Sequence, residues 1–257
     1  MIRVELRDGG CAWVIVDRPH ARNALTLPMW DRLREIALDL DGDPAVRTVV
    51  ITGSGPHAFV AGTDIAEFRA FQNGADGVAY EKRVEAAITA LEAIRVPTIA
   101  AIAGACTGGG VSIAATCDLR IGAPNARIGI PVARTLGNCI SAANMARLAR
   151  LIGLDTAKRL ILSAGLLDAN GAREAGFLTA IAASEEALAD EAAAAAGKLA
   201  DLAPITLRAT KEMCRRLRAA QPLPFDEDLI RLAYGSADFR EGLNAFLDKR
   251  PPRYSGR

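Results

Sequence analysis

The segment that decides the fold is GACTGGGVSIAATC, residues 104–117. It follows TIAAIA at residues 98–103, an uninterrupted apolar run that is typical of a buried strand. Residues 109–116 are apolar and small, which predicts a buried helix, so the glycines form a turn between strand and helix. Such a turn leaves backbone N–H groups unpaired at the start of the helix, where they can bind a negatively charged oxygen.

A second loop of the same kind lies earlier in the chain. Residues 58–65, AFVAGTDI, come after the short apolar run TVVIT at residues 48–52. Two N–H donors that converge on one oxygen form an oxyanion hole, in which each donor contributes about 2.7–4 kcal/mol. Asp64 also suits the position before a helix, because its carboxylate can cap free N–H groups. Taken alone, either loop is explained as a tight turn, so the functional interpretation depends on the pair.

Composition narrows the possible partners. The chain has 257 residues, 51% of them hydrophobic and 24% charged, which predicts a globular protein with a full core. A net charge of +1 and an aromatic content of 5% favour neither nucleic acid nor a membrane surface as partner. Five scattered cysteines without a CxxC pair, together with two histidines, predict a cytoplasmic protein with neither disulfides nor a metal site. Pro97 and several glycines interrupt the uncharged residues 96–117, which favours a buried strand and helix over a membrane span.

Three glycine-rich patterns resemble nucleotide-binding or hydrolase motifs, but each lacks a neighbouring element or residue that its motif requires. GSGPHA at residues 53–58 fits a dinucleotide-binding pattern, but no helix is predicted to begin there. Ser112 lies in a near match to the nucleophile elbow, yet both histidines precede it, whereas the histidine of an α/β-hydrolase follows the serine. The loop at residues 104–110 lacks the lysine of a P-loop, because Gly110 holds that position.

Hydrophobic periodicity predicts alternating strands and helices, followed by a helical end. Strands are expected at residues 2–6, 11–16, 48–52, 98–103 and 119–122, and helices at about 28–40, 77–95 and 109–116. Ser184 is expected to cap a further helix, with two or three more helices following to about Leu247. We therefore expect an α/β core over residues 1–195 and a helical region over residues 196–257.

Four segments, in order along the chain, resemble the motifs of the crotonase (enoyl-CoA hydratase/isomerase) superfamily. They are DRPHARNAL at 17–25, AFVAGTDI at 58–65, GACTGGGVSIAATCD at 104–118 and FLDKRPP at 246–252. The resemblance covers nearly the whole chain. It implies an α/β fold with a crotonase-like ββα spiral core and a helical C-terminal trimerisation region, assembled as a homotrimer or homohexamer.

The resemblance also implies a ligand and its site. The substrate would be an acyl-CoA thioester, with coenzyme A as part of the substrate and no tightly bound cofactor. The backbone N–H groups of Thr63 and Gly109 would hold the thioester oxygen while an enolate forms. Residues matching the family's CoA contacts are Arg22, Ala24, Ala61, Asp64, Ile65, Ala66, Lys249 and Arg250. For the last two, a solvated basic tail is the other explanation.

The sequence departs from the hydratases of this family at both catalytic glutamates. Ser112 and Val132 stand at those positions. Water addition needs a base that activates water and an acid that protonates the α-carbon, so we expect a poor hydratase. Ser112 can orient a hydroxyl or a water, or simply pack in a buried helix. Arg134, the charged residue nearest to Val132, can clamp a substrate carboxylate or form a surface ion pair.

Four further residues are candidates, two for the acyl pocket and two, remote from it, for a relocated base. Asn138 and Cys139 could line the acyl pocket, although a buried cysteine usually acts as a small hydrophobe. Glu67 and Glu81 are candidates for a relocated base, or are carboxylates on exposed helix faces. Three functions stay open. They are an enzyme of the enoyl-CoA hydratase/isomerase type, a decarboxylase or thioester hydrolase using Arg134 and the oxyanion hole, and a non-catalytic acyl-CoA binding protein.

Overall fold

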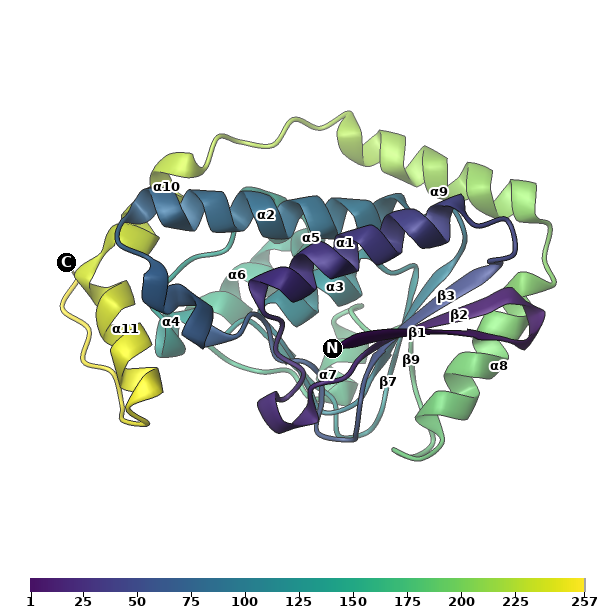
Figure 1. Cartoon of the computed structure of the whole chain (residues 1–257), viewed down its shortest axis with the longest axis horizontal. Coiled ribbons are helices and arrows are strands. Elements are labelled where there is room, and N and C mark those ends of the chain that lie inside the picture. Colours follow the sequence, from purple (N-terminus) through teal and green to yellow (C-terminus); the bar gives the residue numbers. More distant parts are fainter. Residues whose placement is uncertain (257) are drawn as a thin grey trace.

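The computed structural model describes residues 1–256, which form two sheets enclosed by helices (Figure 1). The larger sheet has the order β1 (Ile2–Arg7), β2 (Cys11–Val16), β3 (Thr48–Gly53), β5 (Thr98–Ile102), β7 (Leu119–Gly122) and β9 (Ala180–Ile181). The smaller sheet has the order β4 (Ala58–Val60), β6 (Ala105–Thr107) and β8 (Arg127–Gly129). Strands β1 and β2 pair antiparallel, and the other pairs among these strands are parallel.

A repeated unit relates the two sheets. Along the chain, β3 leads into β4, β5 into β6 and β7 into β8, so three strands of the larger sheet each continue into one strand of the smaller sheet. A helical segment follows each of these strand pairs. This confirms the predicted ββα spiral. The loops that follow β4 and β6 begin at the same end of the smaller sheet, because these two strands are parallel neighbours.

Helices cover both faces of the larger sheet. The main core packs β-strand side chains against α1 (Leu27–Gly42), α2 (Gly74–Ala93) and α3 (Gly109–Thr116), with Trp30 fully buried. A second cluster lies on the other face, where α8 (Leu188–Ala200) packs against β3 and β5 (Figure 1). The remaining helices are α4 (Val132–Thr135), α5 (Ala142–Ile152), α6 (Leu154–Leu162), α7 (Ala169–Glu174), α9 (Pro204–Ala219), α10 (Glu227–Gly235) and α11 (Ala237–Leu247). Three short 3-10 helices span Asp8–Gly10, Pro19–Ala21 and Ile65–Ala70, the last labelled η3.

The predicted strands are confirmed, and α3 has the predicted bounds. Helix α2 begins at Gly74, three residues earlier than expected, because Asn73 and Asp76 form a capping box there. The helix expected to begin after Ser184 was placed wrongly. The Ser184 hydroxyl accepts the N–H of Ala187 in a turn at 3.2 Å, and the helix begins only at Leu188.

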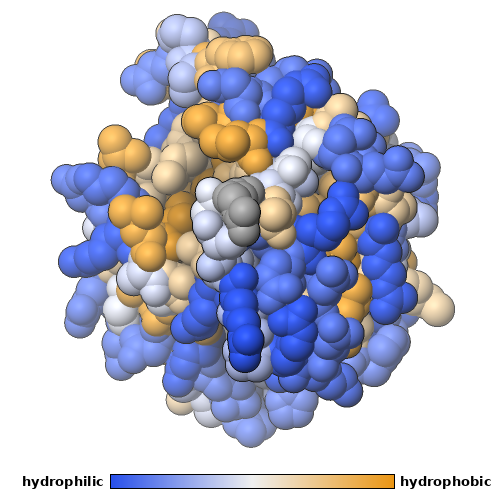
Figure 2. Space-filling view, turned by 90° about the vertical axis from the view of Figure 1, so that its left-hand side faces the viewer, coloured by the Kyte–Doolittle hydropathy of each residue, from blue (hydrophilic) through white to orange (hydrophobic). Residues whose placement is uncertain are grey.

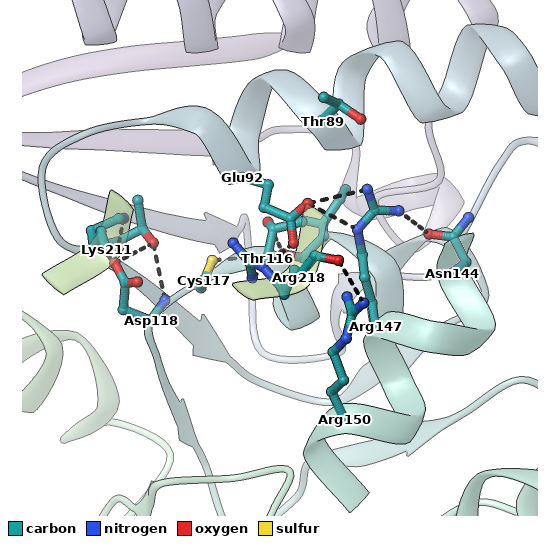
Figure 3. Close-up of polar contacts among 12 residues, drawn as sticks. Thr89, Glu92, Thr116, Cys117, Asp118, Asn144, Arg147, Arg150, Lys211 and Arg218 are labelled. Atoms are coloured by element: carbon teal, nitrogen blue, oxygen red, sulfur yellow. Dashed lines mark hydrogen bonds and ion pairs between the residues drawn. The ribbon is translucent and has the colours of Figure 1, made fainter. Parts of the chain in front are cut away.

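The C-terminal part consists of helices, as predicted, and is held to the body in two ways. The expected boundary at residue 195 lies inside α8, which packs on the sheet. Helix α9 has no buried residue and is fixed by polar contacts, among them Lys211 to Asp118 and Arg218 to Glu92 (Figure 3). Helices α10 and α11 instead share a small apolar cluster with η3 and the start of α2.

Apolar side chains remain exposed on this C-terminal part. Figure 2 shows apolar surface gathered among hydrophilic residues at the end of the molecule that carries α10 and α11. Phe225, Leu229 and Leu232 are 76%, 58% and 72% exposed. Across residues 1–256, no helix combines the length and apolar character that crossing a bilayer requires.

Candidate active site

The two glycine loops meet beside the smaller sheet. Strands β4 and β6 pair Ala58 with Ala105, so the loops that follow them start side by side. Gly62 has φ +100°, a conformation that L side chains rarely adopt. A Cβ built on Gly109 would lie 3.7 Å from the Cα of Gly62, so the loops are in van der Waals contact. The structure thus brings together the loops that carry Thr63 and Gly109, which lie 46 positions apart in the sequence.

Each loop presents a free backbone donor. Leu25 donates to the Gly62 carbonyl and accepts from the Asp64 N–H, both at 2.8 Å, and this leaves the N–H of Thr63 unused. Gly109 is the first residue of α3, where an N–H has no acceptor within the helix. Among the described residues, neither N–H has a hydrogen-bond partner. Two free donors in touching loops, one of them at the positive end of a helix dipole, can hold an oxygen that carries negative charge.

Trp30 supports both donors. Its indole N–H donates to Oγ1 of Thr63 at 2.9 Å, and the same Oγ1 lies 2.7 Å from the hydroxyl of Tyr80. The indole ring also borders Gly109, where a Cβ would approach Trp30 Cζ2 to 2.7 Å. Alanine at position 109 would therefore keep the N–H but would push against a fully buried ring.

Asn23 fixes the first motif to the second, a role that sequence reasoning missed. It is buried with φ +57°, and its side-chain amide donates to the carbonyls of Ser54 at 3.0 Å and Ala58 at 2.7 Å. Its Oδ1 accepts the N–H of Arg18 at 3.0 Å. An asparagine in a turn is the signal, because it tolerates a positive φ and its amide can bond to several backbone groups.

Asp64 caps the segment after the second loop, as predicted. Its carboxylate accepts the N–H of Ala66 at 3.0 Å at the start of η3. The same carboxylate pairs with Arg18 at 2.7 Å, and Arg18 also donates to the carbonyl of Ala24 at 3.0 Å. These bonds tie the first motif to the second loop.

The structure brings most of the residues assigned to CoA contacts to this pair of loops. Arg22 is exposed beside Asn23, and its carbonyl accepts the N–H of Ala61 at 3.2 Å. Six of the eight residues therefore border the same loops, namely Arg22, Ala24, Ala61, Asp64, Ile65 and Ala66. In residues 1–256, Arg250 instead binds Glu241 at 2.6 Å, and Lys249 is exposed at the end of α11.

The two positions that the sequence resemblance assigns to the hydratase glutamates carry no acid. Ser112 is buried on α3, one turn from Gly109, and its hydroxyl has no hydrogen-bond partner within the described part of the chain. Val132 begins α4 and packs, half-buried, against the main core. Arg134 is exposed two residues later and forms no ion pair with any of residues 1–256.

A buried carboxyl group lies elsewhere, on α2. Glu81 is the one acidic residue among the buried polar residues of the described chain, and its Oε1 accepts the Tyr234 hydroxyl at 2.8 Å. That hydroxyl accepts a hydrogen bond from Asn138 Nδ2 at 2.9 Å. Burial raises the pKa of Glu81 to about 7, against the lowering effect of hydrogen bonds from Tyr234 and Ser141. Sequence reasoning named Glu81 among its candidates, but nothing local marked it as buried.

The other two candidates behave differently. Glu67 lies in the first turn of η3 and is only half-buried. Cys139 is half-buried near Glu81, and burial raises the pKa of its thiol to about 12, so it stays a neutral thiol at physiological pH. It packs with the apolar cluster of α10 and α11, in agreement with the role of a small hydrophobe.

An arginine-lined cleft lies away from these loops. It has a volume of about 410 Å³ and is bordered by α2, α5 and α9, including Arg147, Arg150 and Arg218 (Figure 3). On α2, the first residue that lines this cleft is Thr89. Thr89 lies nine residues, or about 13 Å along the helix axis, beyond Tyr80, the residue of α2 that contacts Thr63. Glu92 lies between Arg147 and Arg218 and pairs with both, so much of the positive charge is neutralised inside the protein.

Comparison with known proteins agrees with this fold. A family profile described as "Enoyl-CoA hydratase/isomerase" matches residues 7–257. The chain is 34% identical over 254 residues to the "Probable enoyl-CoA hydratase echA8" of Mycobacterium bovis, covering 98% of this chain and 96% of that protein.

Solved structures show the same fold. The crystal structure of an enoyl-CoA hydratase/carnithine racemase from Magnetospirillum magneticum superposes with a TM-score of 0.81 at 31% identity, covering 100% of this chain and 96% of that one. A methylmalonyl-CoA decarboxylase in complex with 2-nitronate-propionyl-CoA superposes with a TM-score of 0.89 at 27% identity, covering 100% and 98%.

A ββα spiral with two free N–H donors at touching glycine loops defines a crotonase-like protein. The chain belongs to the enoyl-CoA hydratase/isomerase family, a family of acyl-CoA-processing enzymes. The resemblance seen in its four sequence motifs is thereby confirmed.

Proposed function

We propose that the protein stabilises the enolate of an acyl-CoA thioester between the backbone N–H groups of Thr63 and Gly109. The observation that carries the proposal is the contact between the two loops, each with an unpaired donor. When a bond to the α-carbon breaks heterolytically, its electron pair moves into the thioester carbonyl and the negative charge collects on the oxygen. Donors fixed where that charge develops lower the barrier, because no solvent has to reorganise.

Hydration of an enoyl-CoA is a poor fit to this site. The two glutamates that would activate water and protonate the α-carbon are replaced by Ser112 and Val132, and neither can exchange a proton at neutral pH. The unpaired hydroxyl of Ser112 can orient a substrate group but cannot serve as a base. We therefore place the protein among the members of the family that form an enolate without adding water.

Decarboxylation of a malonyl-type thioester is the second candidate. It is favoured by the likeness to the methylmalonyl-CoA decarboxylase, whose TM-score of 0.89 exceeds that of the hydratase/racemase structure. Loss of CO2 leaves its electron pair on the α-carbon and gives the same enolate, so this reaction begins without a carboxylate base. Arg134, unpaired and exposed on α4, would supply a guanidinium for the departing carboxylate.

Exchange of the α-proton tests enolate formation without knowledge of the natural acyl group. The protein is incubated with butyryl-CoA in D2O, and mass spectrometry follows deuterium incorporation at the α-carbon. We expect exchange well above that of a protein-free control, together with calorimetric binding of butyryl-CoA and none of NAD. Binding without exchange, and without CO2 release from malonyl-CoA, would favour a non-catalytic binding protein. Absence of CoA thioester binding would overturn the proposal.

We also propose that the protein assembles as a homotrimer or homohexamer. Ile205, Met213 and Leu217 lie on one face of α9 and are 83%, 64% and 67% exposed. Helix α9 contributes no buried residue to the rest of the chain, so this apolar face needs another surface to cover it. Sedimentation at micromolar concentration should show three or six chains per particle, and a stable monomer would contradict the proposal.

A further inference from the structure

We infer that Glu81 is the acid–base residue of this site, carried by α2 in place of the two hydratase glutamates, and that Tyr234 is its positioning residue. The inference rests on the proposed enolate function. The Glu81 cluster consists of Glu81, Tyr80, Asn138, Ser141 and Tyr234. It places a carboxyl group that can exchange a proton close to the side chains that support the oxyanion hole.

The side chains of Tyr80 and Tyr234 connect the hole to Glu81. The Tyr80 hydroxyl lies 2.7 Å from Oγ1 of Thr63, whose N–H is one of the two donors. The Tyr234 hydroxyl donates to Oε1 of Glu81 at 2.8 Å. The aromatic rings of Tyr80 and Tyr234 lie 5.9 Å apart between centroids, so the partner of Glu81 packs on the same group of side chains.

Residues from four segments surround the Glu81 carboxyl group. They are Tyr80 on α2, Asn138 after α4, Ser141 before α5 and Tyr234 on α10. The side-chain oxygen Oδ1 of Asn138 is buried and has no hydrogen-bond partner among residues 1–256. A buried acceptor is seldom left unpaired, so a water or a bound molecule would supply the donor that this atom lacks.

Glu81 is free to exchange a proton, whereas the other carboxylates of α2 are not. Glu85 and Glu92 both pair with the buried Arg147, at 2.6 and 3.2 Å. Glu81 forms no ion pair within the described chain, and its partners are neutral hydroxyl groups. A carboxylate held by an arginine stays ionised, while one held by hydroxyls in a buried site can take up and release a proton near neutrality.

The proposed step balances with this one carboxyl group. The Glu81 carboxylate takes a proton from the α-carbon, and the electron pair of the broken C–H bond moves through the carbonyl to the thioester oxygen. The N–H groups of Thr63 and Gly109 hold that oxygen. The resulting Glu81 acid returns the proton to the α-carbon, or to the γ-carbon of a 3-enoyl chain, which moves the double bond by one position. The reaction class is proton transfer within the acyl group, with no water added.

The charge state of Glu81 gives the step a pH dependence. Burial raises the pKa of Glu81 to about 7, so the base form accumulates as the pH rises through that value. The titratable groups that face it from the surrounding segments are Tyr80, Glu85, Cys139, Asp226 and Tyr234. The Tyr234 hydroxyl lowers the pKa of Glu81, whereas Glu85 and Asp226 raise it. Removal of the Tyr234 hydroxyl should therefore move the rise in rate to higher pH.

The test compares α-proton exchange of butyryl-CoA in the wild type, Glu81→Gln and Glu67→Gln. Glu81→Gln keeps the size and a hydrogen-bond acceptor but cannot take a proton, so we expect its exchange rate to fall at least about a hundredfold. Its calorimetric affinity for butyryl-CoA should stay within a few-fold of the wild type. Glu67→Gln, the matched change of a half-buried carboxylate, should exchange like the wild type. Tyr234→Phe should shift the pH profile upward.

The outcomes separate this inference from the proposed function. Wild-type exchange that persists in folded Glu81→Gln with an unchanged pH profile would overturn the role of Glu81 and leave the oxyanion hole standing. A wild type that binds butyryl-CoA but shows neither exchange nor CO2 release from malonyl-CoA would overturn the enolate proposal itself, whereas CO2 release without exchange would keep that proposal and overturn the role of Glu81. If Glu81→Gln does not fold, an unshifted profile in Tyr234→Phe would count against the inference.

Discussion

The two glycine loops and the Glu81 cluster are built from different parts of the chain and in different ways. The loops offer backbone N–H groups, which every residue except proline carries, and glycine only has to let two turns approach each other. The cluster offers a side chain whose acidity depends on burial and on hydroxyls from distant segments. One region depends on backbone conformation, the other on tertiary environment.

This difference explains how one fold supports several reactions. On the proposed function, a hole made of backbone N–H groups would survive most substitutions, so stabilisation of an enolate would be retained while the acid–base groups change. Ser112 and Val132 would be such a change, at the positions that the sequence resemblance assigns to the glutamates of hydratases. If Glu81 replaces them, the chemistry has moved to another helix without disturbing the loops. Four experiments test the independence of these two regions, in order of decreasing effect.

The largest effect is expected from removing one loop donor. Gly109→Pro and Gly109→Ala both add the Cβ that meets Trp30, but only proline removes the N–H. Proline is tolerated at the first position of a helix, so α3 should still form. We expect α-proton exchange in Gly109→Pro to be slower than in Gly109→Ala by about a hundredfold or more, which corresponds to one lost donor. Equal rates in the two folded variants would show that this N–H is not used.

The next effect concerns the stability cost of burying Glu81. Below about pH 4.5 the Glu81 carboxyl group is protonated in both the folded and the unfolded protein. Between pH 4.5 and about 7, only the folded protein keeps this proton. The free energy of unfolding should therefore decrease across this window, by about 3 kcal/mol, and level off above it. Urea denaturation at pH 4 and pH 8 should show this loss in the wild type and in Glu67→Gln, and lack it in Glu81→Gln. The same pH dependence in Glu81→Gln would mean that another group is responsible.

A smaller effect is expected at Asn23, which anchors the first motif to the loops. Asn23→Ala removes one accepted and two donated hydrogen bonds and places alanine at φ +57°. We expect a loss of about 2 kcal/mol in the free energy of unfolding. Asn23→Asp keeps the acceptor but sets a buried carboxylate oxygen against the carbonyls of Ser54 and Ala58, so it should be at least as destabilised as Asn23→Ala. An unchanged stability in Asn23→Ala would contradict this anchoring role.

The smallest effect is a gain of activity. Ser112→Glu combined with Val132→Glu restores carboxylates at both hydratase positions, and crotonyl-CoA hydration should rise about tenfold above a very low wild-type rate. This is less than the 10²–10⁴-fold typical of each group, because Ser112 is buried and a carboxylate there would be partly protonated. Loss of the enoyl absorbance measures the reaction, with Ser112→Gln plus Val132→Gln as the neutral control. Efficient hydration by the wild type would mean that Glu81 already activates water.

Much of the fold was predictable because its signals are local. Apolar runs at residues 48–52 and 98–103 became β3 and β5, and the helix predicted at 109–116 is α3. Helices α4 to α7 were not predicted, because they are short segments of 4–11 residues whose apolar faces become evident only against the core. The helix start predicted at Ser184 was wrong for a related reason. A serine that can cap a helix also stabilises an isolated turn, and the turn is what forms here.

The sequence by itself determined the two glycine loops, the capping role of Asp64 and the absence of glutamate at positions 112 and 132. Those features depend on residue type and on a few neighbouring dihedral angles, which the chain carries locally. Only the tertiary structure decided that Trp30 supports both donors and that Glu81 is a buried acid without an ion pair in the described chain. The hydrogen bond between Glu81 and Tyr234 joins residues 153 positions apart. The acidity of a carboxyl group follows from desolvation and from its partners, and no short stretch of sequence contains either.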